Sequence, residues 1–196
     1  MVTNIWSGTK VRLRPVQPTD WRAFHENDQD SEGARLCDSL HFPRSEEGTK
    51  AWAERTSSMG VEGDNIFLAV ETLEGTLVGS ITANHCDRRN GTFKYGVAVF
   101  RSHWRRGYAS EAIRILLHYY FQELRYRKAN AHVYAFNEGS RALQEHLGFI
   151  QEGILRDMIF TQGRHYDEYV YGLTKDEFEE LNRLYKASYE RSEGKQ

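Results

Sequence analysis

Hydrophobic residues recur at every third or fourth position over residues 109–124, which makes this segment the clearest helix in the chain. The apolar side chains share one face for four turns, or about 24 Å of helix. They are Ala109, Ala112, Ile113, Leu116, Leu117, Tyr120, Phe121 and Leu124. Strand-like segments lie on either side, at 92–100 and 129–136. Strand, long helix and strand form a crossover unit, so these two strands are predicted to be parallel neighbours.

Alternating apolar and polar positions predict the remaining strands. A short strand begins near Lys10 and ends at Pro15, because proline cannot donate to a sheet ladder. Two hairpins are expected, since each pair of strands is joined by a turn that contains glycine. The first pairs residues 65–72 with 76–86 around Glu74-Gly75, and the second pairs 149–160 with 165–173 around Gln162-Gly163.

Capping residues mark the shorter helices. One helix is expected after Thr19 or Asp20, and a second from Ser45 through Trp52. A third has Asn137 as its N-cap and Gly148 as its C-terminal stop, and the last begins with a capping box of Thr174 and Glu177. The acidic stretch between Asn27 and Arg44 is expected to be irregular, because Pro43 breaks it.

The composition favours one globular domain. Of the 196 residues, 39% are hydrophobic, which is enough for a sizeable core. Neither an internal repeat nor a linker divides the chain. A single domain is therefore expected over 1–196, with its core at about 9–173 and a C-terminal helix over about 175–190.

Charge, cysteine content and the first residues narrow the class of protein. The net charge of -2 at pH 7 gives no global attraction to DNA or to an anionic membrane. Cys37 and Cys86 are too few for a disulfide framework, so both are interpreted as reduced thiols in a cytoplasmic protein. The opening MVTNIWSGTK lacks the apolar core of a secretory signal, and no run approaches the ~20 apolar residues of a membrane span.

Cations gather before the long helix. Between Asp87 and Glu111 no acidic residue interrupts the sequence, and the stretch HWRRGYASEA (103–112) places two arginines where the helix begins. Unpaired N–H groups already make that end positive, so cations destabilise it unless an anion binds there. A solvated basic face is the alternative. The six cations are Arg88, Arg89, Lys94, Arg101, Arg105 and Arg106.

The small residues of this stretch point to a phosphate ligand. Gly107 lets a ligand approach the backbone closely, and Ala109 keeps the next turn small. Residues 104–110 are therefore interpreted as a pyrophosphate cradle. A P-loop would need a Gly-Lys-Ser/Thr ending, and a dinucleotide fingerprint would need three spaced glycines; neither is present here.

The same stretch resembles the acetyl-CoA loop of the GNAT N-acetyltransferases, in which Gln/Arg-x-x-Gly-x-Gly/Ala precedes a long helix. Trp104 replaces the first residue of that motif, as in the subgroup similar to the ribosomal-protein alanine acetyltransferases (the RimJ/RimL type). Three further segments resemble that subgroup: VRLRPVQPTDW, NEGSRALQEHLGF and EGILRDMIFTQGRHYDEYVYGL. The four motifs occur in the family's order and cover about residues 9–173.

This resemblance implies a fold and a co-substrate. The fold is α+β, an α/β/α sandwich around a mixed, mostly antiparallel sheet of about seven strands, with a splayed parallel pair at the cofactor site. The co-substrate is acetyl-CoA, with its pantetheine arm along one strand and its pyrophosphate on the loop; no metal is implied. The implied cofactor-binding residues are Val97, Ala98, Val99, Trp104, Arg105, Arg106, Gly107, Tyr108, Ala109, Ser110, Asn137 and Ser140.

The family's reaction is attack of an amine on a thioester, whose carbonyl oxygen becomes an oxyanion that needs preorganised donors. A backbone N–H within Val97–Val99 is the implied donor. Many relatives place a tyrosine seven residues after the asparagine as general acid, but this chain has Gln144 there, which cannot serve as an acid. Ser140 is the nearest substitute, directly or through a water; helix capping or a cofactor contact is its alternative role.

The general base is left open. Relatives often have a glutamate two residues before the strand's glycine, where this chain has Lys94. Surface exposure is the alternative for every other candidate. These candidates are Glu152, Asp157, Asp167 and Glu168 on the closing hairpin, with His85 and His103 elsewhere.

The acceptor site is expected to come from residues 27–60 and the closing hairpin. Its acidic segment ENDQDSE would attract a cationic acceptor such as a polyamine or a basic peptide N-terminus, unless it is only a solvated loop. The sequence does not say whether the chain is a monomer or a homodimer, and it predicts no nucleic acid or membrane partner.

The leading hypothesis is an acetyl-CoA-dependent N-acetyltransferase. It would acetylate a protein N-terminal α-amine or a small-molecule amine by direct transfer in a ternary complex. A polyamine (spermidine-type) N-acetyltransferase, a catalytically weak CoA-binding sensor and an RNA-binding module that uses the basic run are the alternatives.

Overall fold

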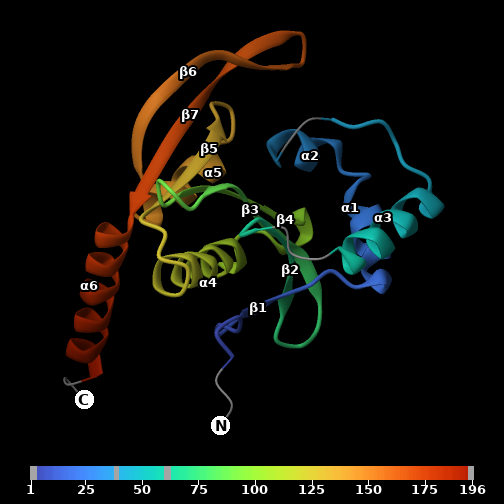
Figure 1. Ribbon diagram of the computed structural model, residues 1–196. Coiled ribbons are helices and arrows are strands. Elements are labelled where there is room, and N and C mark those ends of the chain that lie inside the picture. Colours follow the sequence, from blue (N-terminus) through green and yellow to red (C-terminus); the bar gives the residue numbers. More distant parts are fainter. Residues whose placement is uncertain (1–3, 38–39, 60–62, 194–196) are drawn as a thin grey trace.

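The fold is built on one mixed β-sheet. A computed structural model describes residues 4–37, 40–59 and 63–193, with side chains as far as Leu184. The sheet has seven strands in the order β1-β2-β3-β4-β5-β7-β6, and each neighbouring pair is antiparallel except β4 and β5 (Figure 1). The strands are β1 (Val11–Arg14), β2 (Ile66–Thr72), β3 (Leu77–Asp87), β4 (Thr92–Val99), β5 (Lys128–Tyr134), β6 (Ile150–Thr161) and β7 (Arg164–Thr174).

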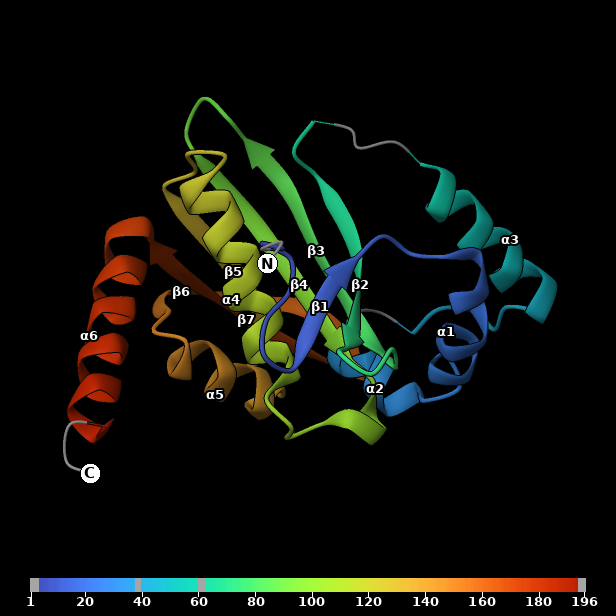
Figure 2. The same cartoon turned by 90° about the horizontal axis from the view of Figure 1, so that it is seen from below.

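Helices cover both faces of this sheet. Figure 2 shows α4 and α5 lying across the face that is turned toward the viewer. Adjacent residues of β2 reveal the two layers, because Val70 packs into the cluster under α4 while Ala69 packs against Phe24 of α1. This arrangement confirms the expected α+β sandwich and its parallel pair of strands. The described helices are α1 (Trp21–Asn27), α2 (Ser31–Cys37), α3 (Glu46–Ser58), α4 (Tyr108–Gln122), α5 (Glu138–His146) and α6 (Lys175–Glu193), with 3-10 turns η1 (Pro18–Asp20) and η2 (Arg101–His103).

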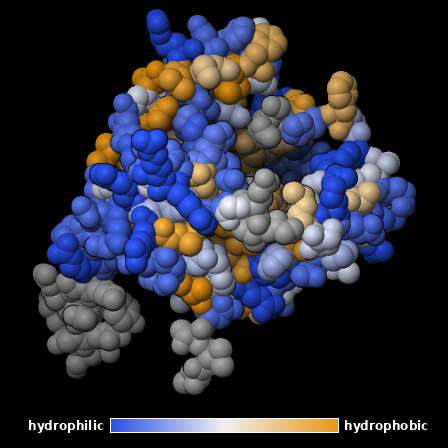
Figure 3. Space-filling model, in the orientation of Figure 1, coloured by the Kyte–Doolittle hydropathy of each residue, from blue (hydrophilic) through white to orange (hydrophobic). Residues whose placement is uncertain are grey.

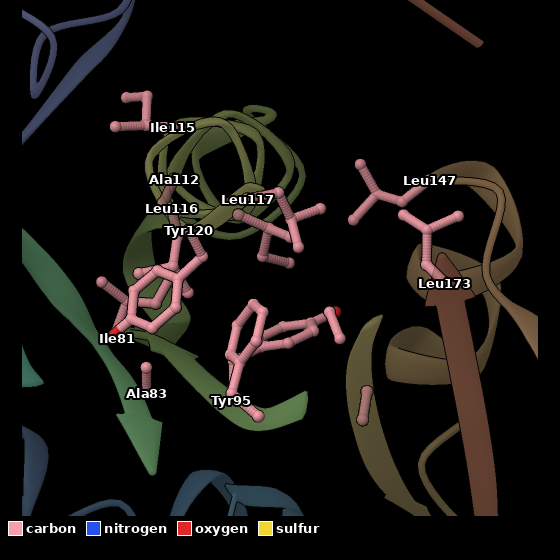
Figure 4. Packing of buried hydrophobic residues seen from close by; sticks show 14 of the residues in the cluster. Ile81, Ala83, Tyr95, Ala112, Ile115, Leu116, Leu117, Tyr120, Leu147 and Leu173 are labelled. Atoms are coloured by element: carbon pink, nitrogen blue, oxygen red, sulfur yellow. The ribbon is translucent and has the colours of Figure 1, made fainter. Parts of the chain in front are cut away.

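The main core lies between α4 and the centre of the sheet. Leu116, Leu117 and Tyr120 point from α4 toward β3 and β4 and are almost fully buried (Figure 4). The helix ends at Gln122, earlier than its apolar period suggests, although Leu124 still packs against the same cluster. The predicted apolar stripe therefore forms the core contact that holds α4 across the sheet.

Several predicted caps and turns are confirmed. The Thr174 hydroxyl and the Glu177 carboxylate exchange the hydrogen bonds of a capping box, and Ser45 caps α3 by accepting a bond from the backbone N–H of Gly48 at 3.1 Å. Gln162 and Gly163 have φ angles of 51° and 77°, as a two-residue hairpin turn of the type I′ kind requires. These local sequence signals thus fix the ends of elements far from the core.

The segment between Asn27 and Arg44, expected to be irregular, contains the helix α2. None of its residues is fully buried, so it shows no apolar stripe from which a helix could be predicted. Asp30 begins the helix by accepting a hydrogen bond from the backbone N–H of Gly33 at 3.1 Å, and it also pairs with Arg101 of η2. Tertiary polar contacts, rather than an amphipathic pattern, stabilise this helix.

The C-terminal helix α6 docks at the end of β7. Phe178 is 4% exposed and belongs to the main core, and Leu181 packs beside it near Gly148. Figure 1 shows the rest of α6 extending away from the sheet. Among the helices that the structure describes, none combines the length and apolar character needed to cross a membrane.

A network of ion pairs joins β1 to β2 and η1. The Glu71 side chain is 7% exposed and lies between Arg12 and Arg14, with Arg14 Nε 2.7 Å from Glu71 Oε1. Arg14 also pairs with Asp20 at 2.7 Å. Burial alone would raise the pKa of the Glu71 carboxyl, but hydrogen bonds from Arg14 and Arg12 outweigh it and hold the pKa below its usual value.

Glu71→Gln is expected to lower the free energy of unfolding by about 2 kcal/mol at neutral pH, less than for a fully buried pair because both arginines are partly exposed. Since the pKa is lowered on folding, the carboxylate stabilises the protein above the unfolded pKa of about 4.3, and this contribution is lost as the pH falls through the folded value. Urea unfolding should show that the free energy of unfolding falls more between about pH 6 and about pH 3 in the wild type than in the variant. Glu123→Gln, at an exposed carboxylate, is the control, and equal acid sensitivity of wild type and Glu71→Gln would contradict the prediction.

Candidate active site

The parallel strands β4 and β5 separate soon after they meet. Their pairing runs only from Thr92–Lys94 to Lys128–Asn130, so residues 95–99 of β4 have no partner on β5. A cavity of about 790 Å³ opens at this divergence, which is a usual size for a small-molecule site. Residues 95–99 are thus the half of β4 that is unpaired on its β5 side. Backbone groups there that point toward β5, other than the Val99 carbonyl bonded by Trp104, can bind a ligand.

Most of the residues predicted to bind the cofactor line this cavity. Val97, Val99, Asn137 and Ser140 do so, as do the loop and first-turn residues apart from Arg106. Ala98, between Val97 and Val99 on β4, is not among the residues that line it. The loop residues that line the cavity are Trp104, Arg105, Gly107, Tyr108, Ala109 and Ser110.

Gly107 sets the start of α4. It is the N-cap residue and has a φ of 82°, in the left-handed region that glycine adopts without strain. The first intrahelical bond runs from the Glu111 N–H to the Gly107 carbonyl at 3.1 Å, so the preceding N–H groups have no partner within the helix. Their residues, Tyr108, Ala109 and Ser110, face one end of the cavity. This first turn is suited to hold an anion.

Trp104 anchors the loop that precedes α4. Its indole Nε1 donates a hydrogen bond of 2.6 Å to the carbonyl oxygen of Val99, the last residue of β4. The guanidinium of Arg101 lies over the indole ring, 5.1 Å from its centroid. The tryptophan that separates this sequence from the usual loop motif thus ties the cradle to the strand beside it.

Glu111 binds the N-terminal segment instead of merely complementing the helix dipole. Its carboxylate accepts hydrogen bonds from the backbone N–H groups of Thr9, Lys10 and Val11 at 2.7–2.9 Å. Burial alone would raise the pKa of the Glu111 carboxyl, but the bonds from Thr9, Val11 and Lys10 outweigh it and lower the pKa. A Cβ on Gly8 would lie 2.5 Å from Glu111 Cδ, so this close approach requires glycine. Helix α4 and β1 are therefore joined at the first turn of α4.

Two of the six cations noted in the sequence are used in ion pairs. Arg88 binds Asp64, and Arg101 binds Asp30. Arg105 lines the cavity beside the first turn of α4, whereas Arg106 bonds the carbonyl of Ser102 at 3.4 Å. The run is therefore divided among separate contacts and does not form one continuous basic face.

Asn137 joins three parts of the site. Its Oδ1 accepts the backbone N–H of Ser140 at 2.9 Å, so the predicted N-cap of α5 is confirmed. Its Nδ2 donates to the carbonyl of Leu36 in α2 at 2.8 Å. Capping and the lining of the cavity coexist in this side chain. In the described part of the chain, the Ser140 hydroxyl, which also lines the cavity, has no hydrogen-bond partner.

The buried side chain of Tyr95 lies beside Gln144, the α5 residue at the position where many relatives have a tyrosine. Gln144 is 2% exposed, and its Oε1 accepts a hydrogen bond from the hydroxyl of Tyr95 on β4. Burial raises the pKa of Tyr95 well above its usual value, so the phenol stays protonated. Both residues line the cavity; Gln144 was noted in the sequence as the replacement for the relatives' tyrosine, whereas Tyr95 was not noted.

The candidate bases are scattered. His103 lines the cavity near the cradle, and burial, with a contribution from Arg106, lowers its pKa, so its imidazole is neutral at pH 7. Glu152 forms an ion pair with Lys128 at 2.7 Å, and Asp167 accepts the backbone N–H of Asp157 at 3.0 Å. The exposed side chain of His85 bonds Asn84.

Glu168 does not line the cavity itself but contacts His132, which does. His132 was not among the candidates taken from the sequence. The two side chains are 3.0 Å apart, and His132 lines the cavity. A histidine at one position of an alternating strand carries no sequence signal of its own. Its importance is visible only because the splayed strands open beside it.

Helix α2 closes the other end of the cavity. Leu36 and Cys37 line it, and Arg35 Nε donates to Thr161 Oγ1 of the β6–β7 hairpin at 3.1 Å. The acidic segment is largely neutralised, because Asp28, Asp30 and Glu32 pair with arginines. These carboxylates stabilise the local fold more than they attract a cation.

Comparison with known proteins explains this arrangement. Residues 10–150 match the family model described as "Acetyltransferase (GNAT) domain". This chain belongs to the GNAT acetyltransferase family. This GNAT protein is 43% identical over 180 residues to the "SPbeta prophage-derived uncharacterized N-acetyltransferase YokL" of Bacillus subtilis (strain 168), covering 91% of this chain and 98% of the relative. It is 28% identical over 140 residues to the ribosomal-protein-serine acetyltransferase of Escherichia coli (strain K12), covering 69% and 77%.

Solved structures share the fold at lower identity. A GCN5-related N-acetyltransferase from Brucella melitensis has a TM-score of 0.77 at 24% identity, covering 93% of this chain and 83% of that one. Spermidine N-acetyltransferase from Vibrio cholerae, in complex with CoA and spermine, has a TM-score of 0.75 at 19% identity, covering 87% and 99%. This GNAT protein is an N-acetyltransferase that uses acetyl-CoA, and the first turn of α4, whose N–H groups have no partner within the helix, fits that co-substrate.

Proposed function

We propose that this enzyme transfers the acetyl group of acetyl-CoA directly to a primary amine while both substrates are bound. A single cavity supports this proposal, because it runs from the first turn of α4 to α2 along the unpaired half of β4. One end suits a phosphate and the other an acceptor, so both can meet beside Val97. The chain would work as one domain over 1–196, in the cytoplasm, as a monomer or homodimer.

The cofactor-binding residues would act mainly through their backbone. The N–H groups from Arg105 to Ser110 would hold the pyrophosphate, and Arg105 would add charge. The unpaired N–H groups of β4 within Val97–Val99 would bond the pantetheine arm and the oxyanion. A rigid strand and helix end provide both sets of donors, which keeps the reacting carbonyl in place.

Proton transfers set the remaining demands on the site. Neutralising a lysine-like amine with pKa ~10.4 at pH 7 costs about 4.6 kcal/mol, whereas an α-amine near 7.7–8 costs only about 1–1.4 kcal/mol. The thiolate that leaves is comparatively stable, with a thiol pKa of about 8.5. A general base therefore matters more than a general acid, and most of all for a side-chain or polyamine acceptor.

The acceptor class is proposed from the RimJ/RimL-type loop, with Trp104 bonded to the end of β4. That subgroup suggests a protein N-terminal α-amine, and similarity to a ribosomal-protein-serine acetyltransferase supports it. A polyamine is the second candidate, favoured by the similarity in fold to a spermidine N-acetyltransferase. A mass-spectrometric screen of alanine-start peptides, spermidine and amino sugars with acetyl-CoA decides between them. No acetylated product and no CoA release from any acceptor would favour a CoA-binding sensor.

Ser140→Ala is expected to lower kcat about tenfold if the hydroxyl protonates the leaving thiolate, with the dissociation constant of acetyl-CoA unchanged within about threefold. The free hydroxyl in the cavity is the reason for this expectation. Steady-state kinetics and isothermal titration measure the two effects. Full turnover would remove Ser140 as the acid. Cys37→Ala tests whether the acetyl group instead passes through a covalent acetyl-cysteine, and direct transfer predicts that this variant keeps its turnover.

A further inference from the structure

A histidine and a glutamate on neighbouring strands form a pair at the wall of the cavity. His132 Nδ1 lies 3.0 Å from Glu168 Oε2, and their side chains are 24% and 12% exposed. His132 is on β5, and Glu168 on β7 lies directly opposite Tyr134, two residues further along the strand. Both side chains are thus on one face of the sheet, with the imidazole partly open to the cavity.

This face is the one opposite α4. Ala131 and Val133, which flank His132 in β5, belong to the core under α4, so alternation turns His132 to the other side. Leu36 and Cys37 of α2 line the part of the cavity that is distant from α4. His132 therefore lies away from the phosphate-binding turn, where an acceptor amine rather than the nucleotide would enter.

Glu168 determines which imidazole nitrogen is available. A carboxylate only accepts hydrogen bonds, so Nδ1 of His132 must be the donor in this pair. In the neutral imidazole the proton is then on Nδ1, and Nε2 keeps its lone pair. The same logic orients the histidine of other acid–base sites, where a carboxylate fixes the tautomer and stabilises the imidazolium.

We propose that His132 is the general base that takes a proton from the acceptor ammonium, and that Glu168 is its positioning residue. This inference rests on the proposed function and adds to it a residue for the more demanding of its two proton transfers. The cavity brings His132 together with Val97 and Ser140. The six bases considered from the sequence include only one that lines the cavity directly, His103, which lies at the phosphate-binding end.

The proton balance is complete without another reactant. Nε2 of His132 takes one proton from the ammonium, and the freed lone pair of the amine attacks the thioester carbon. The C–N bond forms, the C–S bond breaks, and its electron pair remains on sulfur. The amide nitrogen loses its second proton, and the sulfur gains one to become a thiol. His132 finally releases its proton to water, so the net products are the amide, CoA and one proton.

Other ionisable groups near His132 could also affect a pH profile. Burial and Arg106 lower the pKa of His103, and burial raises that of Tyr95. The profile is therefore assigned by comparing variants and not from the wild type alone. The groups that line the cavity are Cys37 of α2, Tyr95 of β4, His103 and Arg105 of the loop, Tyr108 of α4, and Glu138 and His146 of α5, while Lys94 lies on the same face of β4.

The test measures acetylation of the best acceptor from the screen by wild type, His132→Gln and Glu168→Gln. His132→Gln is expected to lower kcat about 10²–10⁴-fold at about pH 7, as loss of a general base does. Glu168→Gln keeps the size but not the charge, and should lower kcat about tenfold, with little change in the KM for acetyl-CoA. His165→Gln, at an exposed histidine of the same β7 strand, is the matched control and should behave as wild type.

The decisive measurement is the pH dependence of the defect. Without the base, the reaction must use amine that is already neutral in solution. The neutral fraction grows about tenfold for each unit by which the pH rises toward the amine's own pKa, so the rate difference between wild type and His132→Gln should shrink by the same factor as the pH rises. A defect that is constant with pH would indicate a structural role and overturn the proposal, as would full activity of the variant. Isothermal titration with acetyl-CoA distinguishes failure of this proposal from failure of the proposed function. If the wild type neither binds acetyl-CoA nor turns over, the proposed function is rejected.

Discussion

Gly107→Glu is expected to weaken acetyl-CoA binding about a hundredfold or more. The residue caps α4 with a φ of 82°, where a non-glycine residue costs about 1–2 kcal/mol. The new carboxylate would also occupy the position in which the first turn of α4 is proposed to bind the pyrophosphate, and it would repel that group. Because about 1.4 kcal/mol corresponds to a tenfold change, steric blocking and repulsion worth about 2.8 kcal/mol together account for the expected loss. Isothermal titration with acetyl-CoA measures it.

Gly163→Glu is the matched control for this variant. Gly163 has a φ of 77° in the turn of the β6–β7 hairpin, and a Cβ there would meet nothing within 4 Å. The substitution brings the same charge and the same backbone strain at a position outside the cavity. Its affinity for acetyl-CoA should equal that of the wild type. Unchanged binding by Gly107→Glu would sink the assignment of the loop as the cofactor cradle.

Glu111→Ala is expected to reduce the free energy of unfolding by about 3 kcal/mol. The substitution removes the acceptor of the N–H groups of Thr9, Lys10 and Val11, and hydrogen bonds to a charged group contribute about 1.5–3 kcal/mol each before water replaces them. Urea denaturation followed by circular dichroism measures the change. Glu54→Ala, at an exposed carboxylate of α3, controls for loss of a helical glutamate and should change stability little.

Gly8→Ala gives an independent measure of the same contact. The added Cβ would meet the Glu111 carboxylate at 2.5 Å and displace it, so the single variant should also be destabilised. In the Glu111→Ala background that clash no longer exists, and Gly8→Ala should then cost almost nothing. Additive effects of the two substitutions would show that they act separately and would contradict the contact between Glu111 and the segment that follows Gly8.

The strongest sequence patterns predicted the framework of the fold. The apolar stripe of α4 and the two strands beside it imply a crossover, and the parallel pairing of β4 with β5 confirms it. Asn137 was predicted correctly as a cap because a side-chain oxygen at a helix start has one dominant partner, the nearby backbone N–H. Such predictions succeed because the interactions lie close together in sequence.

The parts that sequence did not predict depend on distant contacts. Helix α2 lacks a buried stripe and is stabilised by Arg101 and Thr161, which are far away in the chain. No sequence pattern connects Glu111 with its partners, which lie about a hundred residues earlier. His132 shows the same limit, since its partner belongs to another strand and the cavity beside it exists only where β4 and β5 separate.

The exposed part of the closing hairpin also lies outside what local patterns describe. Figure 3 shows apolar side chains along the β6–β7 hairpin at the top of the molecule, and Ile154, Met158 and Phe160 of β6 are each more than half exposed. β6 is the last strand of the sheet, and its register against β7 shifts between Gln151 and Gly153 and between Leu155 and Ile159. Without a further strand or helix against it, an apolar residue at such an edge stays exposed.

Helix α2 makes the site modular. Asp30 just before this helix and residues within it contact η2, α5 and the hairpin through a few polar bonds, whereas the first turn of α4 belongs to a helix that packs on the main core. On the proposed function, exchange of this one short helix between homologues would alter acceptor choice and leave the proposed phosphate site unchanged. In evolutionary terms, the enzyme would acquire new amine substrates while its acetyl-CoA site stays unchanged. A mutant library restricted to residues 31–37 is therefore a compact starting point for changing the acceptor specificity.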